Sequence, residues 1–102
     1  MRKRSFAQGL IFLFWLAATS PLWGQGRLFV VGSLPDFAAI AQEIGGEKVE
    51  VASIARGNEN PHFVLPKPSF ARLLQKADLF ITTGLDLELW APTLIDASRN
   101  RR

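Results

Sequence analysis

Apolar positions between residues 27 and 98 alternate between short continuous runs and stripes spaced like one face of a helix. Three runs are typical of strands buried on both faces, and they occupy Leu28 to Val31, Val49 to Ala55 and Asp78 to Thr83. A helical stripe follows each run. Strict alternation of strand and helix predicts an α/β fold of the β-α-β-α-β-α type, with a parallel sheet flanked by helices on both faces.

The first predicted helix carries residues suited to both of its ends. Ser33 is expected to cap it, Pro35 fits its first turn, and Gly45-Gly46 supplies a left-handed stop. Its apolar stripe, expected to face the sheet, consists of Phe37, Ile40, Ala41 and Ile44.

The other two predicted helices begin with prolines. Pro68 suits a first helical position because its missing N–H has no helical partner there, and the stripe that follows is Phe70, Leu73, Leu74 and Ala77. The last stripe is Leu87, Trp90, Leu94 and Ala97, in a helix that is interrupted or begins late at Pro92.

A basic N-terminus adds an export signal to this pattern. Arg2, Lys3 and Arg4 precede the apolar run Leu10 to Ala18 and a small-residue stretch, which is typical of a secretory signal peptide. The run is shorter than the roughly 20 residues of a bilayer span, although an uncleaved membrane anchor starting near Phe6 is the alternative. We expect cleavage after Gly24, so residues 1–24 are the signal, residues 25–98 the folded body of the mature chain and residues 99–102 a tail.

Charge and cysteine content narrow the class of protein. The chain has 12 Lys and Arg against 9 Asp and Glu, and removal of three leader bases leaves 12 − 3 = 9 against 9, a net charge of zero. This balance argues against a nucleic-acid partner, and Arg99, Arg101 and Arg102 are expected to form a solvated chain end. Because there is no cysteine, we expect neither disulfides nor a lipid-bearing Cys, hence a soluble exported protein that is not a lipoprotein and is not stably inserted in the membrane.

The segment Arg56 to Pro66 is the strongest candidate for chemistry. It follows the second strand, fits neither helix nor strand spacing, and contains His62, the only histidine. Carboxyl ends of parallel strands are where ligands bind, so His62 is a candidate metal ligand whose ring could be oriented by Asn58, Glu59 or Asn60. The plain alternative is a loop histidine hydrogen-bonded to backbone.

Other polar residues favour structural roles over catalysis. Asp86 and Glu88 are two residues apart, which does not place them on one helix face, and acids at a helix start complement its dipole. Trp90 is expected in the core or at a contact between lobes. The chain contains no GxGxxG, GxxxxGKS/T, HExxH or GxSxG motif, so nothing in the sequence supports an enzyme or an organic cofactor.

Three separated segments resemble the substrate-binding proteins of zinc and manganese ABC transporters. The Pro61-His62 pair with the later Pro66-Lys67-Pro68-Ser69 is similar to the first metal-ligand loop of that family. Leu28 to Gly46 is similar to its opening strand and helix, and Ala77 to Trp90 to its third strand and the following turn.

The resemblance implies a two-lobed periplasmic protein that holds a zinc or manganese ion in the cleft between its lobes and delivers it to a membrane permease. His62 matches the first ligand, while the family's other ligands lie beyond the matched residues. We therefore expect an N-terminal fragment that does not bind metal tightly by itself, because one imidazole gives little affinity. The alternative hypothesis is a small exported interaction or adhesion module without metal.

Overall fold

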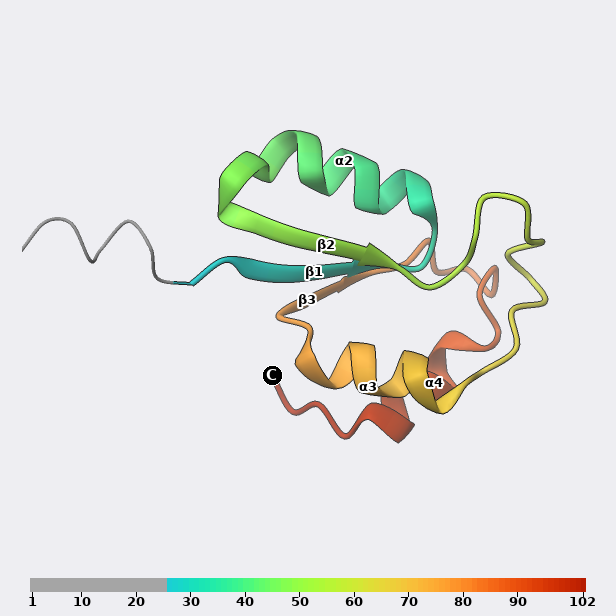
Figure 1. Cartoon of the computed structure of the whole chain (residues 1–102). Helices are drawn as coiled ribbons and strands as arrows, with labels where there is room; N and C mark the ends of the chain where they lie inside the picture. The colour runs from blue at the N-terminus through green and yellow to red at the C-terminus, as the bar shows by residue number, and fades with distance from the viewer. Residues whose placement is uncertain (1–25) are drawn as a thin grey trace, which may run out of the picture.

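A three-stranded parallel sheet lies at the centre of residues 26–102, the part of the chain that the computed structural model describes (Figure 1). Its strands are β1 (Leu28–Gly32), β2 (Val49–Ser53) and β3 (Leu79–Ile81), in the order β2-β1-β3. Both pairings are parallel. The predicted fold class is confirmed, and the predicted signal peptide lies outside the described residues.

Three helices cover the two faces of this sheet. Helix α2 (Pro35–Gly45), followed by the short 3-10 turn η2 (Gly46–Lys48), lies on one face, and α3 (Pro68–Lys76) and α4 (Ala91–Ser98) lie on the other (Figure 1). The prolines stand in the first turns as predicted, and Gly46 ends α2 with a φ of 54°. Helix α4 starts one residue before Pro92, which confirms the late start.

The predicted cap of the first helix is wrong. Leu34 occupies the position before α2, and no side chain caps the helix there. Ser33 is fully buried, and its hydroxyl donates a 2.6 Å hydrogen bond to Glu88, 55 residues along the chain. The Ser33 hydroxyl therefore binds a residue far away in sequence and does not cap the helix that follows it.

The face that α2 turns to the sheet also differs from the prediction. Ile40 and Ile44 are 56% and 82% exposed, whereas Ala38 is buried. Gly45 lies directly against Val49 of β2, where an added Cβ would overlap the valine methyl groups. The small residues Ala38 and Gly45 thus lie where α2 is close to the sheet, whereas the two isoleucines of the predicted stripe are exposed.

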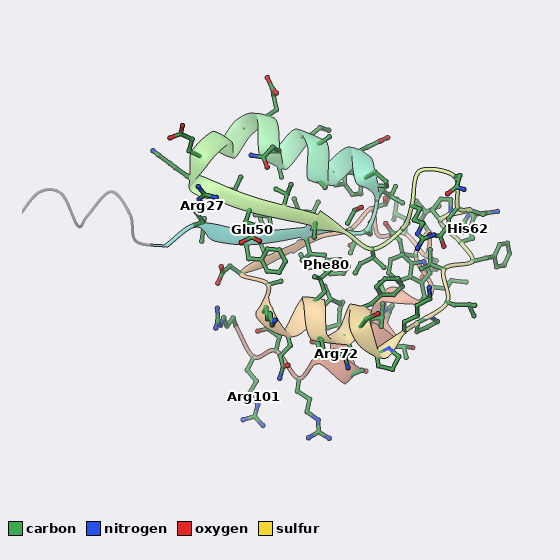
Figure 2. All side chains as sticks on the ribbon, in the orientation of Figure 1. Arg27, Glu50, His62, Arg72, Phe80 and Arg101 are labelled. Atoms are coloured by element: carbon green, nitrogen blue, oxygen red, sulfur yellow. The ribbon has the colours of Figure 1, made fainter. Side chains whose placement is uncertain are left out.

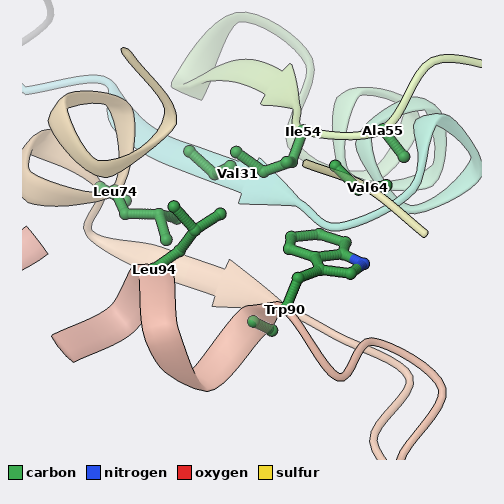
Figure 3. Close-up of a cluster of buried hydrophobic side chains, with 9 residues drawn as sticks. Val31, Ile54, Ala55, Val64, Leu74, Trp90 and Leu94 are labelled. Carbon is green, nitrogen blue, oxygen red and sulfur yellow. The ribbon is translucent and has the colours of Figure 1, made fainter. Parts of the chain in front are cut away.

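The main core lies between the sheet and the α3–α4 layer (Figure 3). Val31 of the central strand and Leu94 of α4 are almost completely buried in it, and Trp90 packs among them as predicted. The remaining members of this buried cluster are Ile54, Ala55, Val64, Leu74, Ala77 and Ala91. Within residues 26–102, no helix is long and apolar enough to cross a bilayer.

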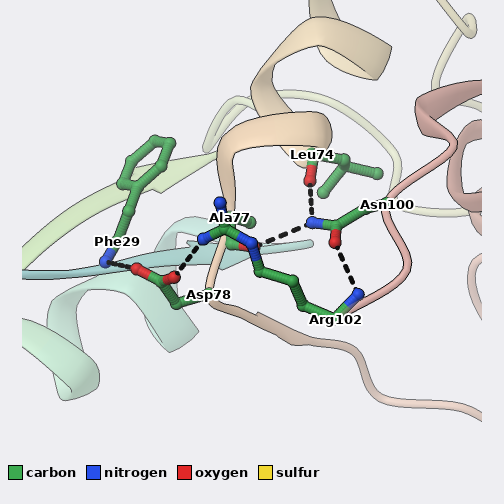
Figure 4. Close-up of polar contacts among 6 residues, drawn as sticks. All are labelled: Phe29, Leu74, Ala77, Asp78, Asn100 and Arg102. Atoms are coloured by element: carbon green, nitrogen blue, oxygen red, sulfur yellow. Dashed lines mark hydrogen bonds and ion pairs between the residues drawn. The ribbon is translucent and has the colours of Figure 1, made fainter.

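The last residues are bound to the fold, so the predicted solvated end is wrong for part of the tail. The side-chain amide of Asn100 donates 2.8 Å hydrogen bonds to the carbonyls of Leu74 and Ala77. Arg102 pairs with Asp78 at 2.7 Å (Figure 4). Arg99 and Arg101 remain exposed, as expected.

Candidate functional site

Three loops meet at the carboxyl edge of the sheet. They follow β1, β2 and β3, and the longest is the β2–α3 loop, which carries His62. Figure 2 shows His62 at the end of the molecule toward which the strands point, opposite the end that carries Arg27. This edge is where open parallel sheets bind ligands, so the position predicted for His62 is the observed one.

The residues before His62 fold into turns closed by their own side chains. Glu59 accepts a 3.0 Å hydrogen bond from the backbone N–H of Arg56, and Asn60 accepts one of the same length from the backbone N–H of His62. Phe63 N–H also donates to the Asn60 carbonyl. Glu59 and Asn60, expected to orient the imidazole, bind the backbone instead, and between residues 26 and 102 no hydrogen bond reaches the ring.

The backbone on both sides of His62 is tied to the core. The indole N–H of Trp90 donates a 2.7 Å hydrogen bond to the carbonyl of Pro61. Val64, two residues after the histidine, is 4% exposed and belongs to the core cluster. His62 itself is exposed. The imidazole therefore faces solvent from a backbone that is fixed on either side.

Glu88 is the buried charge at this edge, and the sequence did not reveal its role. The residue is 5% exposed, and its carboxylate accepts hydrogen bonds from the Ser33 hydroxyl at 2.6 Å, Thr83 N–H at 2.9 Å and Gly84 N–H at 3.2 Å. Burial raises the pKa of Glu88, but these donors together outweigh burial and hold that pKa below its usual value.

The expectation that Asp86 and Glu88 complement the dipole at the start of a helix is therefore wrong, because the first turn of α4 contains no acidic residue. Asp86 is exposed, and α4 starts only at Ala91. The sole hint in the sequence is that Ser33 and Glu88 follow two different strands whose carboxyl ends share one edge.

The turn after β3 has an unusual backbone. Gly84, Leu85 and Asp86 have φ values of 77°, 55° and 61°, a left-handed conformation that costs a non-glycine residue about 1 kcal/mol or more. Glu88 holds this turn through Thr83 and Gly84. The turn consequently projects the side chain of Leu85, which is fully exposed.

Large apolar side chains lie exposed on the β2–α3 loop and on the loop between β3 and α4. Four of them are between 65% and 100% exposed, namely Phe63, Leu65, Leu85 and Leu89. We call these four residues the apolar rim. Several exposed apolar side chains on adjacent loops are typical of surfaces that meet another surface.

Metal donors are sparse in the described part of the chain. Residues 26–102 contain no group of three or more His, Cys, Asp or Glu side chains arranged to hold a metal ion. Glu88 is occupied by three donors, which leaves His62 as the exposed nitrogen ligand at this edge. One imidazole does not make a zinc site, since such sites require three or four ligands.

Comparison with known proteins shows that the sequence and fold of this chain are similar to those of metal-binding proteins of uptake systems. A family model described as zinc-uptake complex component A, periplasmic, matches residues 30–102. The manganese-binding lipoprotein MntA of Halalkalibacterium halodurans is 34% identical over 73 residues, which cover 72% of this chain and 24% of MntA. The zinc-binding lipoprotein AdcA of Streptococcus pneumoniae is 24% identical over 87 residues, covering 85% of this chain and 17% of AdcA.

Solved structures agree with these sequence relatives. A crystal structure of ZnuA superimposes with a TM-score of 0.65 and 31% identity, covering 72% of this chain and 29% of ZnuA. A metal-free periplasmic metal-binding protein of Candidatus Liberibacter asiaticus gives a TM-score of 0.62 at 25% identity, over 74% of this chain and 27% of that protein. The chain spans less than a third of each of these relatives.

Proposed function

Because this chain belongs to the family of periplasmic zinc-uptake components, we propose that it forms part of the solute-binding component of an ABC uptake system for zinc or manganese. His62 supplies one ligand to the transported ion. The proposal rests chiefly on one observation: an exposed histidine at the carboxyl edge of the sheet whose backbone is tied to the core on both sides. The role is binding and delivery, without catalysis or an organic cofactor.

The chemistry of the edge suits such an ion. Neutral imidazole suits zinc, whereas manganese favours carboxylate and other oxygen ligands, so the choice between the two metals depends on the ligands that complete the shell. We propose that those ligands come from outside residues 26–102. Binding would weaken toward acid pH, because a protonated imidazole has no lone pair for the metal.

Export and delivery complete the proposal. Residues 1–24 act as the signal, residues 25–98 form part of an N-terminal lobe with residues 99–102 as its tail, and the loaded protein docks on a membrane permease in the periplasm. MntA and AdcA are lipoproteins by name. This chain has no Cys to carry a lipid. On that ground we predict that it is released from the membrane as a soluble protein.

Substitution of His62 tests the proposal in the native protein, isolated at the length at which the cell makes it. We expect His62→Ala to lower Zn²⁺ affinity, measured by calorimetry, by at least about tenfold, because a four-ligand site loses one ligand. Asn58→Ala is the matched control, since Asn58 is exposed in the same loop. Equal zinc affinity in His62→Ala and the unaltered protein would remove His62 from the site.

The apolar rim favours a second candidate, an exported interaction module that uses this edge without metal. Its four exposed side chains lie on the β2–α3 loop, which carries His62, and on the loop after β3, and they would lose contact with water on association. Sedimentation of the purified protein with and without Zn²⁺ separates the two functions. Defined oligomers that form equally well without zinc favour the module. A monomer whose sedimentation coefficient changes when Zn²⁺ is added favours metal capture.

A further inference from the structure

A short segment after β3 contacts all three loops of the carboxyl edge, and we propose that its Glu88 and Trp90 are positioning residues for His62. We call this pair the Glu88–Trp90 clasp. The inference rests on the proposed function, because a positioned histidine matters only if it binds the ion. Trp90 contacts the loop of His62 directly, and Glu88 acts on that loop through Trp90.

Trp90 acts on the peptide bond next to the histidine. Its indole N–H binds the Pro61 carbonyl at 2.7 Å, and the ring is 5% exposed. Proline fixes its own φ, and the Pro61–His62 peptide is planar. Holding the Pro61 carbonyl therefore sets the orientation of the peptide plane from which the His62 Cα–Cβ bond leaves.

Glu88 fixes the position of Trp90 relative to the sheet. Its carboxylate binds the Ser33 hydroxyl at the end of β1 and the backbone of the turn after β3. Its carbonyl accepts the N–H of Ala91 at the start of α4. A continuous set of contacts thus leads from the central strand through Glu88 and Trp90 to the backbone of His62.

This arrangement suits a site completed by ligands from elsewhere. Several ligands bind one ion tightly only when each is held close to its bound position, and groups behind the ligands commonly change metal affinity by 10- to 100-fold. Since no hydrogen bond fixes the imidazole within residues 26–102, the backbone provides the restraint. Loss of the Trp90–Pro61 bond should therefore loosen the His62 loop while the sheet stays intact.

Two variants of Trp90 remove this hydrogen bond and retain an aromatic ring. Trp90→Phe lacks the donor, and site-specific replacement by benzothienylalanine keeps the two-ring shape but substitutes sulfur for N–H, which separates loss of the donor from loss of volume. Thr93→Ala is the control just beyond this segment, because Thr93 is exposed on α4 and lies outside the apolar rim. Each protein is compared with His62→Ala, in its native length, by hydrogen exchange and by Zn²⁺ calorimetry.

We expect both Trp90 variants to speed amide exchange across residues 58–65 by about fivefold or more, the size of one lost hydrogen bond. Exchange in β1 should not change, and Zn²⁺ affinity should fall by about five- to tenfold. Thr93→Ala should resemble the unaltered protein in both measurements.

Two results would overturn the clasp. One is unchanged exchange in residues 58–65 of both Trp90 variants. The other is faster loop exchange with unchanged zinc affinity in a protein whose His62→Ala variant has lost affinity. If His62→Ala itself binds zinc normally, the proposed function falls and the metal-positioning role falls with it, while the exchange data still report whether Trp90 orders the loop.

Discussion

Two carboxylates tie the chain together at opposite edges of the sheet, and they do so in different surroundings. At the amino edge, Asp78 accepts a 2.8 Å hydrogen bond from Phe29 N–H and pairs with Arg102 (Figure 4). At the carboxyl edge, Glu88 accepts three hydrogen bonds from Ser33, Thr83 and Gly84, all of them neutral donors.

Exposure separates the two groups. The Asp78 side chain is 30% exposed and the Arg102 side chain 67%, so water and salt screen that pair. Glu88 is 5% exposed. A buried carboxylate without a cation depends entirely on its hydrogen bonds, and its donors depend on it in turn. The comparison indicates that the carboxyl edge, where we place the metal ligand, needs Glu88 far more than the amino edge needs Asp78.

Removal of Glu88 should have the largest effect on stability. Glu88→Ala strands the Ser33 hydroxyl and two backbone N–H groups, and we expect it to lower the free energy of unfolding by roughly 2–4 kcal/mol. Urea denaturation followed by circular dichroism measures this loss. The control Glu43→Ala lies on an exposed position of α2 and should change stability by less than about 0.5 kcal/mol. Similar losses in both variants would show that the hydrogen bonds of Glu88 contribute no more to stability than an exposed side chain does.

Acidification should have a smaller effect in the same direction. Hydrogen bonds outweigh burial and lower the pKa of Glu88 in the folded state, so its contribution is complete above its ordinary pKa and is lost as pH falls through the lowered one. Between neutral pH and about pH 3, the unaltered protein should therefore lose more stability than Glu88→Gln. Parallel loss of stability in both proteins would contradict this assignment.

Disruption of the amino-edge pair should have the smallest effect. The hydrogen bond from the backbone N–H of Phe29 is the main cause of the lowered pKa of Asp78. Burial opposes this effect in part, and Arg102 lowers the pKa further. Arg102→Ala removes only the exposed partner and should barely move the urea midpoint, with any shift disappearing at high salt. A large loss that persists in high salt would show that the two edges are more alike than their exposure indicates.

The sequence predicted the parts of the fold that depend on local pattern. The strand runs, the prolines at helix starts and the glycine stop after α2 all act within a few residues, and the structure confirms them. The position of His62 followed from the general rule that parallel strands bring their following loops to one edge.

Contacts between residues far apart in sequence account for what was missed. Ser33 resembles a helix cap in sequence, but 55 residues separate it from the Glu88 carboxylate that it binds. Ile40 and Ile44 are a separate case: they have the correct spacing for a buried stripe, yet they are exposed and α2 buries Ala38 instead. Arg102 was expected in a solvated chain end, but it pairs with Asp78, and the neighbouring Asn100 binds the carbonyls of Leu74 and Ala77.

The direct test of the central claim is the position of a bound metal ion. Crystals of the native protein loaded with Zn²⁺ should give an anomalous scattering peak at the carboxyl edge, about 2.0–2.1 Å from an imidazole nitrogen of His62. Further ligands should come from residues outside the described part of the chain. A zinc ion bound elsewhere, with the His62 ring pointing into solvent, would contradict the account.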